Sequence, residues 1–171
     1  PDVTLNLTMF NRQPIHPDVN KVLGDFTNIA LLGYYAREDF NFMEIVESMK
    51  MQLWNAIEYR SFNVINLLGR LAEKHGDAVA APYVFTSLID SDAEGTEKTM
   101  TKIGFEEIFA QTQTPQVVLD HQLYVRNGKL LLVLDYVKQA FDNEILDELF
   151  ADYTSRVKRL ADMEDWSMLY E

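Results

Sequence analysis

Two apolar runs joined by Asn127-Gly128 constrain the fold of this chain more than any other feature of its sequence. Residues 116–126 and 129–137 carry the β-branched and apolar side chains that are typical of strands. The Asn-Gly dipeptide between them favours a type I′ turn, because both central residues of that turn need positive φ. The pattern therefore predicts an antiparallel hairpin.

Three further segments have strand character. Apolar and polar residues alternate over residues 3–9, and residues 26–35 and 79–89 are apolar runs of strand length. A turn-rich loop with two prolines follows the first of them, at residues 11–18. The polar segment 90–102 is expected to be a mobile surface loop.

Helix periodicity appears in three places. Apolar residues recur at three and four residues from Asn41 to Ile57, which predicts an amphipathic helix of about five turns. Ser61 is expected to cap a second helix that ends at Gly76. Asp142 is expected to cap a last helix. The apolar face predicted for that helix consists of Ile145, Leu149, Tyr153, Val157 and Leu160.

The order of these elements, β-β-α-α-β-β-β-α, predicts an α/β fold in which helices pack on a mixed sheet. A length of 171 residues fits one domain, and a hydrophobic content of 47% is enough for a packed core. The sequence begins with strand pattern almost at once and without a methionine, which predicts that it is a piece of a longer protein.

Composition excludes several classes of partner and location. A formal net charge of -12 repels phosphate backbones and anionic lipid, so neither nucleic acid nor a membrane is expected as a partner. The absence of cysteine excludes disulfides and thiol catalysis, and a reducing compartment follows most simply. No signal peptide or long apolar run is present. These features predict a cytoplasmic protein.

Familiar catalytic and binding motifs are absent from the sequence. The three histidines, His16, His75 and His121, are widely separated and have no metal-ligand spacing, so exposed loop or helix-end positions are expected for them. The sequence has neither a glycine-rich phosphate loop nor a nucleophile-elbow serine motif. Bound cofactors and metals are therefore not expected.

Asp120 is the residue that most needs an explanation. It lies at the end of the apolar run Val117-Val118-Leu119, and a carboxylate facing a core must be hydrogen-bonded, paired or protonated. It is therefore either a structural hydrogen-bonding residue or a working acid/base. Thr86 and Ser87 raise a similar choice, because hydroxyls at a strand end satisfy turn backbone more often than they catalyse.

Four segments, taken together, resemble the motifs of heterocyclization domains, the variant condensation domains of nonribosomal peptide synthetases. Residues 24–27 with the apolar run after them resemble the block GDFTxLxLL, and residues 82–87 resemble PVVFTS with Tyr83 as the one departure. Residues 112–120 resemble SQTPQVxLD, and residues 7–12 resemble LTLFNR. The four occur in the order of the family and cover nearly the whole chain.

The resemblance implies a chloramphenicol-acetyltransferase-like fold made of two lobes, of which residues 1–171 match the C-terminal lobe. The N-terminal lobe and its DxxxxD signature have no counterpart in the sequence, so the isolated lobe is expected to be inactive. The implied partners are donor and acceptor peptidyl carrier proteins, the N-terminal lobe and a neighbouring adenylation domain. The carrier proteins hold phosphopantetheine, and this chain binds no cofactor directly.

The reaction that the resemblance implies joins a carrier-bound acyl or peptidyl thioester to carrier-bound Cys, Ser or Thr. The side-chain thiol or hydroxyl then adds to the new amide and water is lost, which gives the thiazoline or oxazoline of a siderophore or peptide natural product. The residues carried over are Asp120 and Thr86 as catalytic groups and Asn11 and Ser87 as substrate-positioning groups. The alternatives are a non-catalytic or ordinary condensation-type lobe that binds carrier proteins, and an unrelated acidic interaction domain.

Overall fold

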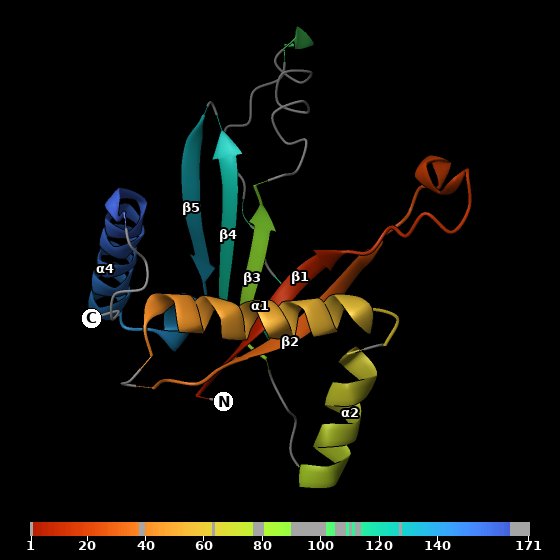
Figure 1. Cartoon of the computed structure of the whole chain (residues 1–171), viewed down its shortest axis with the longest axis horizontal. Helices are drawn as coiled ribbons and strands as arrows, with labels where there is room; N and C mark the ends of the chain where they lie inside the picture. The colour runs from red at the N-terminus through yellow and green to blue at the C-terminus, as the bar shows by residue number, and fades with distance from the viewer. Residues whose placement is uncertain are drawn as a thin grey trace.

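A mixed sheet forms the centre of the structure, a computed structural model that describes residues 2–37, 40–62, 64–76, 81–89, 102–104, 109, 111, 114–126 and 128–164. Within these residues five strands lie in the order β2-β1-β3-β4-β5 (Figure 1). The strands are β1 (Val3–Phe10), β2 (Thr27–Tyr34), β3 (Tyr83–Leu88), β4 (Leu119–Arg126) and β5 (Lys129–Tyr136). The central β1-β3-β4 strands are parallel, and each edge strand is antiparallel to its neighbour. The predicted α/β fold is confirmed.

Three helices accompany the sheet in the described part of the chain: α1 (Phe42–Glu58), α2 (Val64–His75) and α4 (Asn143–Asp162). Two short 3-10 helices, η1 (Val19–Lys21) and η2 (Lys138–Ala140), lie in the connections. In Figure 1, α1 runs across the strands and α4 stands beside β5. The order of strands and helices is the predicted one.

Local hydrogen bonds explain where the helices begin and end. Asn41 and Glu44 form a capping box at α1, in which each side chain accepts from the other's backbone N–H at 2.9 Å. The Asp142 carboxylate accepts from the backbone N–H of Glu144 at 2.9 Å, so its predicted role as the cap of α4 is confirmed. Helix α2 is followed by Gly76, whose φ of 78° is the left-handed conformation that glycine adopts easily.

One face of the sheet is covered by helices. Alternation along the strands puts Leu32 of β2, Leu5 of β1 and His121 of β4 on this face. Helix α1 packs against β2, and Tyr153 of α4 contacts His121. We call this side the helix face. The buried hydrophobic residues of the described chain are Ala30, Leu32 and Leu146, with 2%, 6% and 6% of their surface exposed.

The free edge of β2 is closed by a side chain. The amide of Gln52 in α1 accepts from the backbone N–H of Gly33 and donates to its carbonyl, both at 2.8 Å. Asn28 similarly donates to the carbonyl of Arg60 at 2.7 Å. Since unpaired backbone groups on an edge strand invite pairing with another chain, the two Gln52 bonds protect the edge at Gly33 and attach α1 to it. The Asn28 bond attaches the segment after α1 to the same strand.

Several predicted boundaries are wrong. The run 116–126 becomes a strand only at Leu119, because Pro115 and Gln116 form a turn in which Gln116 has a φ of 68° and Val117 N–H donates to Thr114. Ser61 is not the cap of α2: this helix begins at Val64, so its cap position is residue 63, which lies outside the described residues. The same holds for residues 79–80 of the predicted third strand and 90–101 of the predicted loop.

The apolar face predicted for α4 is also partly wrong. Ile145 and Leu149 are 65% and 52% exposed, whereas their neighbour Leu146 is buried. The half-buried or buried residues at spacings of four and three are Leu146, Phe150, Tyr153, Val157 and Leu160. Alternating spacings of four and three keep these residues on one side of a helix with 3.6 residues per turn. The predicted set begins with three successive spacings of four, so its first residues lie progressively further round the helix from that side.

Candidate functional site

Six polar side chains lie in adjacent positions on the face of the sheet opposite the helix face. Asn6 pairs with Val84 and Val84 with Asp120, so side chains at these positions point the same way. Asp120 in turn pairs with Asp135, and Gln122 pairs with Thr86. We call this side of the sheet the polar face, and the six adjacent residues are Asn6, Thr8, Thr86, Asp120, Gln122 and Asp135.

Hydrogen bonds connect the polar face across and along its strands. The Thr86 Oγ1 hydroxyl donates to Thr8 Oγ1 at 2.9 Å, which joins β3 to β1. The Gln122 side-chain amide donates to Asp120 Oδ2 at 3.3 Å within β4. Asn6 Oδ1 is buried and has no hydrogen-bond partner among the residues that the structure describes. The face therefore combines a held carboxylate, a hydroxyl pair and a buried acceptor.

The two predicted catalytic residues lie on this face together. Thr86 is two positions beyond Val84, the partner of Asp120 on the adjacent parallel strand. Ordinary strand spacing and rise put their Cα atoms roughly 8 Å apart. A substrate group bound over the face could reach both side chains, which is the arrangement that shared proton transfer needs.

The two predicted positioning residues lie elsewhere. Asn11 follows the end of β1, roughly 10 Å further along the strand direction than Thr8. There its side-chain oxygen accepts from Gln13 at 3.1 Å and its backbone N–H donates to Phe26 at 2.9 Å. Ser87 alternates with Thr86, so it points to the other side of the sheet and is exposed. The structure brings neither residue next to Asp120.

Sequence reasoning missed Asn6, Thr8, Gln122 and Asp135. In β1 the signal was present, because Asn6 and Thr8 alternate with apolar residues and were assigned to the polar side of a half-buried strand. What the sequence did not provide was the pairing of β1 with β3, 78 positions away, that sets Thr8 beside Thr86. Which polar residues lie next to one another depends on the register between strands, and the pattern within a single strand does not give that register.

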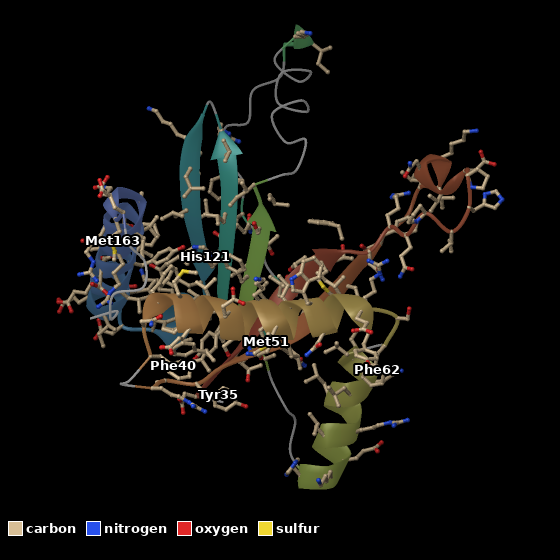
Figure 2. The ribbon with its side chains drawn as sticks, in the orientation of Figure 1. Tyr35, Phe40, Met51, Phe62, His121 and Met163 are labelled. Atoms are coloured by element: carbon tan, nitrogen blue, oxygen red, sulfur yellow. The ribbon has the colours of Figure 1, made fainter. Side chains whose placement is uncertain are left out.

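His121 is half-buried on β4 rather than in the exposed loop or helix-end position that was expected. Its ring stacks on Phe85 at 5.1 Å between centroids and meets Tyr153 edge-on at 5.2 Å, between the sheet and α4 (Figure 2). Burial lowers the pKa of His121 below its usual 6.5, while the charge of Asp120 opposes this shift. Burial also raises the pKa of Tyr153. The neutral imidazole is therefore favoured in the folded chain.

This environment predicts a pH dependence of stability. Because the unfolded chain binds a proton on His121 at a higher pH than the folded chain, the free energy of unfolding should fall as the pH drops from about 7.5 to about 5.5. His121→Phe, which keeps the stacked ring, should reduce that fall when unfolding is followed in urea at several pH values. His16→Phe is the control on an exposed loop histidine and should follow the wild type. Equal curves for all three proteins would contradict the prediction.

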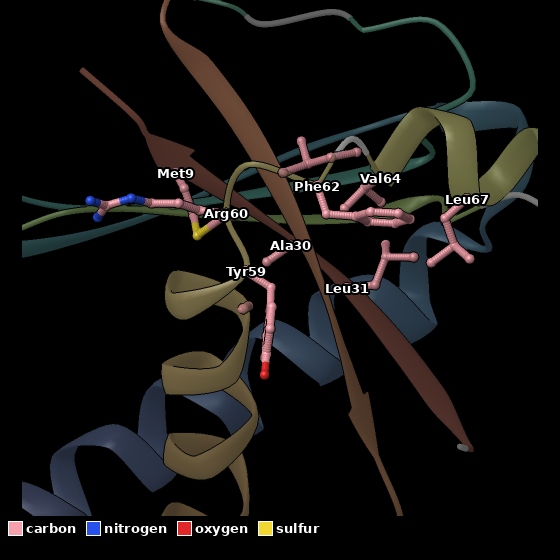
Figure 3. A pocket seen from close by; sticks show the side chains of 10 residues that line it. Met9, Ala30, Leu31, Tyr59, Arg60, Phe62, Val64 and Leu67 are labelled. Atoms are coloured by element: carbon pink, nitrogen blue, oxygen red, sulfur yellow. The ribbon is translucent and has the colours of Figure 1, made fainter. Parts of the chain in front are cut away.

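An apolar hollow of the described surface lies elsewhere, at the edge strand β2. It has a volume of 410 Å³ and is lined mainly by apolar side chains of β2 and of the α1–α2 region (Figure 3). None of the predicted site residues lines it. Among the described residues no group of three or more histidine or acidic side chains could hold a metal ion. The described helices include none with the length and apolarity needed to cross a membrane.

Sequence comparison finds relatives among large biosynthetic enzymes. The chain is 33% identical over 169 residues to bacitracin synthase 1 of Bacillus licheniformis, which covers 96% of the chain and 3% of that protein. It is 32% identical to phenyloxazoline synthase MbtB of Mycobacterium sp. (strain MCS) and 33% identical to pyochelin synthetase PchE of Pseudomonas aeruginosa, each over 92% of the chain. It spans 13% and 11% of those two proteins. No family model matches the chain.

Comparison with solved structures also finds nonribosomal peptide synthetases. The cyclization-docking bidomain of the nonribosomal peptide synthetase EpoB from Sorangium cellulosum matches 96% of this chain with a TM-score of 0.75 and 33% identity, over 33% of its own length. The nonribosomal peptide synthetase FmoA3 matches 98% with a TM-score of 0.80 and 32% identity, over 19% of its length. The first condensation domain of the CDA synthetase, at 15% identity and a TM-score of 0.66, shares the fold over 98% of this chain and 36% of its own. The chain is therefore homologous to part of the condensation- and cyclization-type domains of nonribosomal peptide synthetases.

Proposed function

We propose that this chain is the C-terminal lobe of a heterocyclization domain, and that its polar face supplies the groups for cyclodehydration. The observation that carries the proposal is the position of Asp120 and Thr86 on one side of neighbouring parallel strands. Its relatives include proteins named phenyloxazoline synthase and a solved cyclization bidomain, which supports ring formation over simple condensation. A second lobe would close over the polar face, and two carrier proteins would deliver their tethered substrates to it.

The reaction needs a proton to move twice. In the first stage the amine of the acceptor Cys, Ser or Thr attacks the donor thioester carbonyl, and the carrier thiol leaves. In the second stage the acceptor side chain loses its proton and bonds to the amide carbon, and the amide oxygen takes up that proton and becomes a hydroxyl. That hydroxyl leaves with a proton as water, the nitrogen loses its proton, and a C=N bond closes the five-membered ring.

Asp120 is the group proposed to move that proton. As a carboxylate it accepts the proton of the attacking thiol or hydroxyl, and as a carboxylic acid it gives that proton to the amide oxygen. It then transfers the N–H proton to the departing hydroxyl in the same way. Gln122 holds one carboxylate oxygen at 3.3 Å and so fixes the orientation of the group. Thr86 of β3 is paired with Gln122 of β4, and its side chain would contact the same intermediate.

Mass spectrometry of the carrier-bound product tests the proposal. The complete protein that contains this lobe would be incubated with loaded donor and acceptor carrier proteins, and the acceptor carrier analysed over time. We expect a product one water lighter than the linear condensation product. A linear product alone would favour an ordinary condensation-type lobe, and no product of either kind would favour a lobe that only binds carrier proteins.

A further inference from the structure

The hydroxyl of Thr86 is held by a residue that the proposed chemistry does not yet use. Thr86 Oγ1 donates to Thr8 Oγ1 at 2.9 Å, and both side chains are partly buried. Thr8 follows Leu7, which pairs with Phe85, so the two threonines are neighbours across the β1–β3 pair. Both are β-branched and therefore stiff at χ1, which keeps the two oxygens in contact.

This hydrogen bond decides what Thr86 can offer a substrate. A hydroxyl has one proton to donate and two lone pairs to accept with. A hydrogen bond between two hydroxyls uses at most one lone pair of each oxygen, so Thr86 Oγ1 keeps at least one lone pair for a donor approaching the polar face. Without the Thr8 oxygen, the Thr86 hydroxyl could rotate and direct its proton into the site instead.

We propose that Thr8 is a positioning residue for cyclodehydration, and this rests on the proposed function. Thr8 holds Thr86 Oγ1 in place, where it accepts a hydrogen bond from the N–H of the linear amide. That bond holds the amide carbon in line with the attacking atom, while Asp120 removes the proton of the attacking thiol or hydroxyl. That proton becomes the hydroxyl proton on the former amide oxygen, the N–H proton leaves with this hydroxyl as water, and nothing is consumed besides the linear amide.

Two substitutions at Thr8 and one matched control test this role in the complete protein with loaded carriers. Thr8→Val keeps the shape but removes the acceptor, and should lower the ratio of cyclised to linear product formed per unit time about three- to tenfold. Thr8→Ser keeps the acceptor and should restore the ratio to within about twofold. Thr4→Val is the control, since Thr4 lies on the same strand and face but pairs with Gly33 at the far end.

A second measurement separates positioning from general damage. In a Thr86→Val background, Thr8→Val should lower the ratio no further, because residues that act through one another are not additive. The proposal would be overturned if Thr8→Val lowered the ratio of cyclised to linear product in the Thr86→Val background as much as in the wild type. It would also be overturned if Thr8→Val and Thr4→Val gave equal ratios. If Thr8→Val does not fold, Thr8→Cys replaces it, since a thiol is a weak acceptor and should lower the ratio in the same direction. A wild-type protein that makes only linear product would overturn the proposed function itself, and with it the role of Thr8.

Discussion

Asp120→Asn is expected to slow cyclodehydration by about two to four orders of magnitude, the usual contribution of a general acid or base. Asparagine has nearly the same shape and can still accept from Gln122, so the packing of β4 should change little. It cannot take the proton of the acceptor side chain or return one to the departing hydroxyl. The linear amide should therefore accumulate. Rate constants for the linear and the cyclised product, measured separately by mass spectrometry, give the two stages.

Asp135→Asn is the matched control for this experiment. Asp135 lies opposite Asp120 on β5 and on the same polar face, so its replacement removes a negative charge from the same region. We expect a much smaller decrease in the rate constant of cyclodehydration than for Asp120→Asn, because the chemistry needs a carboxyl group at position 120 and not only a negative potential. If Asp120→Asn instead lowered both rate constants equally and also lowered the unfolding midpoint, Asp120 would be a structural residue, the other role that its sequence position allowed.

Periodicity within single segments was enough to predict most of the fold. The alternation in residues 3–9, the change to helix spacing after Asn41 and the cap at Asp142 are local signals, and the structure has β1, α1 and α4 at these places. The hairpin prediction was also local, and β4 and β5 pair as expected around Gly128, whose φ is 71°. Each of these signals acts over a few residues, where backbone sterics and hydrogen bonding decide the outcome.

The candidate site could be predicted only in part, because it depends on pairing between distant segments. Family motifs pointed to Asp120 and Thr86, and the parallel β3–β4 register puts them on one face. The same reasoning named Ser87, which strand alternation turns to the opposite face, and did not name Thr8. A one-residue difference along a strand reverses the side chain's direction, so residue type alone could not separate Thr86 from Ser87.

Parallel pairing has a further consequence for the site. Parallel neighbours cannot be joined by a tight turn, so β1, β3 and β4 come from three distant parts of the chain. Thr8, Thr86 and Gln122 meet only after these long connections have closed and the helix face has packed. The polar face is thus positioned by the apolar contacts on the other side of the same strands, and its geometry depends on the stability of that core.

Leu146→Ala is expected to produce the largest loss of stability, about 2–5 kcal/mol in the free energy of unfolding. Leu146 is the buried hydrophobic side chain of α4 among the described residues, with 6% of its surface exposed. Its truncation removes apolar burial and leaves a cavity at the N-terminal end of the helix that carries Tyr153 against His121. Urea unfolding should show a lower midpoint. The slope of the free energy of unfolding against urea concentration should change little, because unfolding exposes nearly the same surface area in both proteins.

Ile145→Ala makes this prediction specific to the orientation of α4. Ile145 is the adjacent residue and the one that helix spacing alone had placed in the core, yet it is 65% exposed. Its truncation should change the free energy of unfolding by no more than about 0.5 kcal/mol, as for other surface positions. A large loss for Ile145→Ala and a small one for Leu146→Ala would mean that α4 is rotated by about one residue, or 100°, from its position in the structure. Tyr153 would then turn away from His121, and the lowered pKa of that histidine would lose its cause.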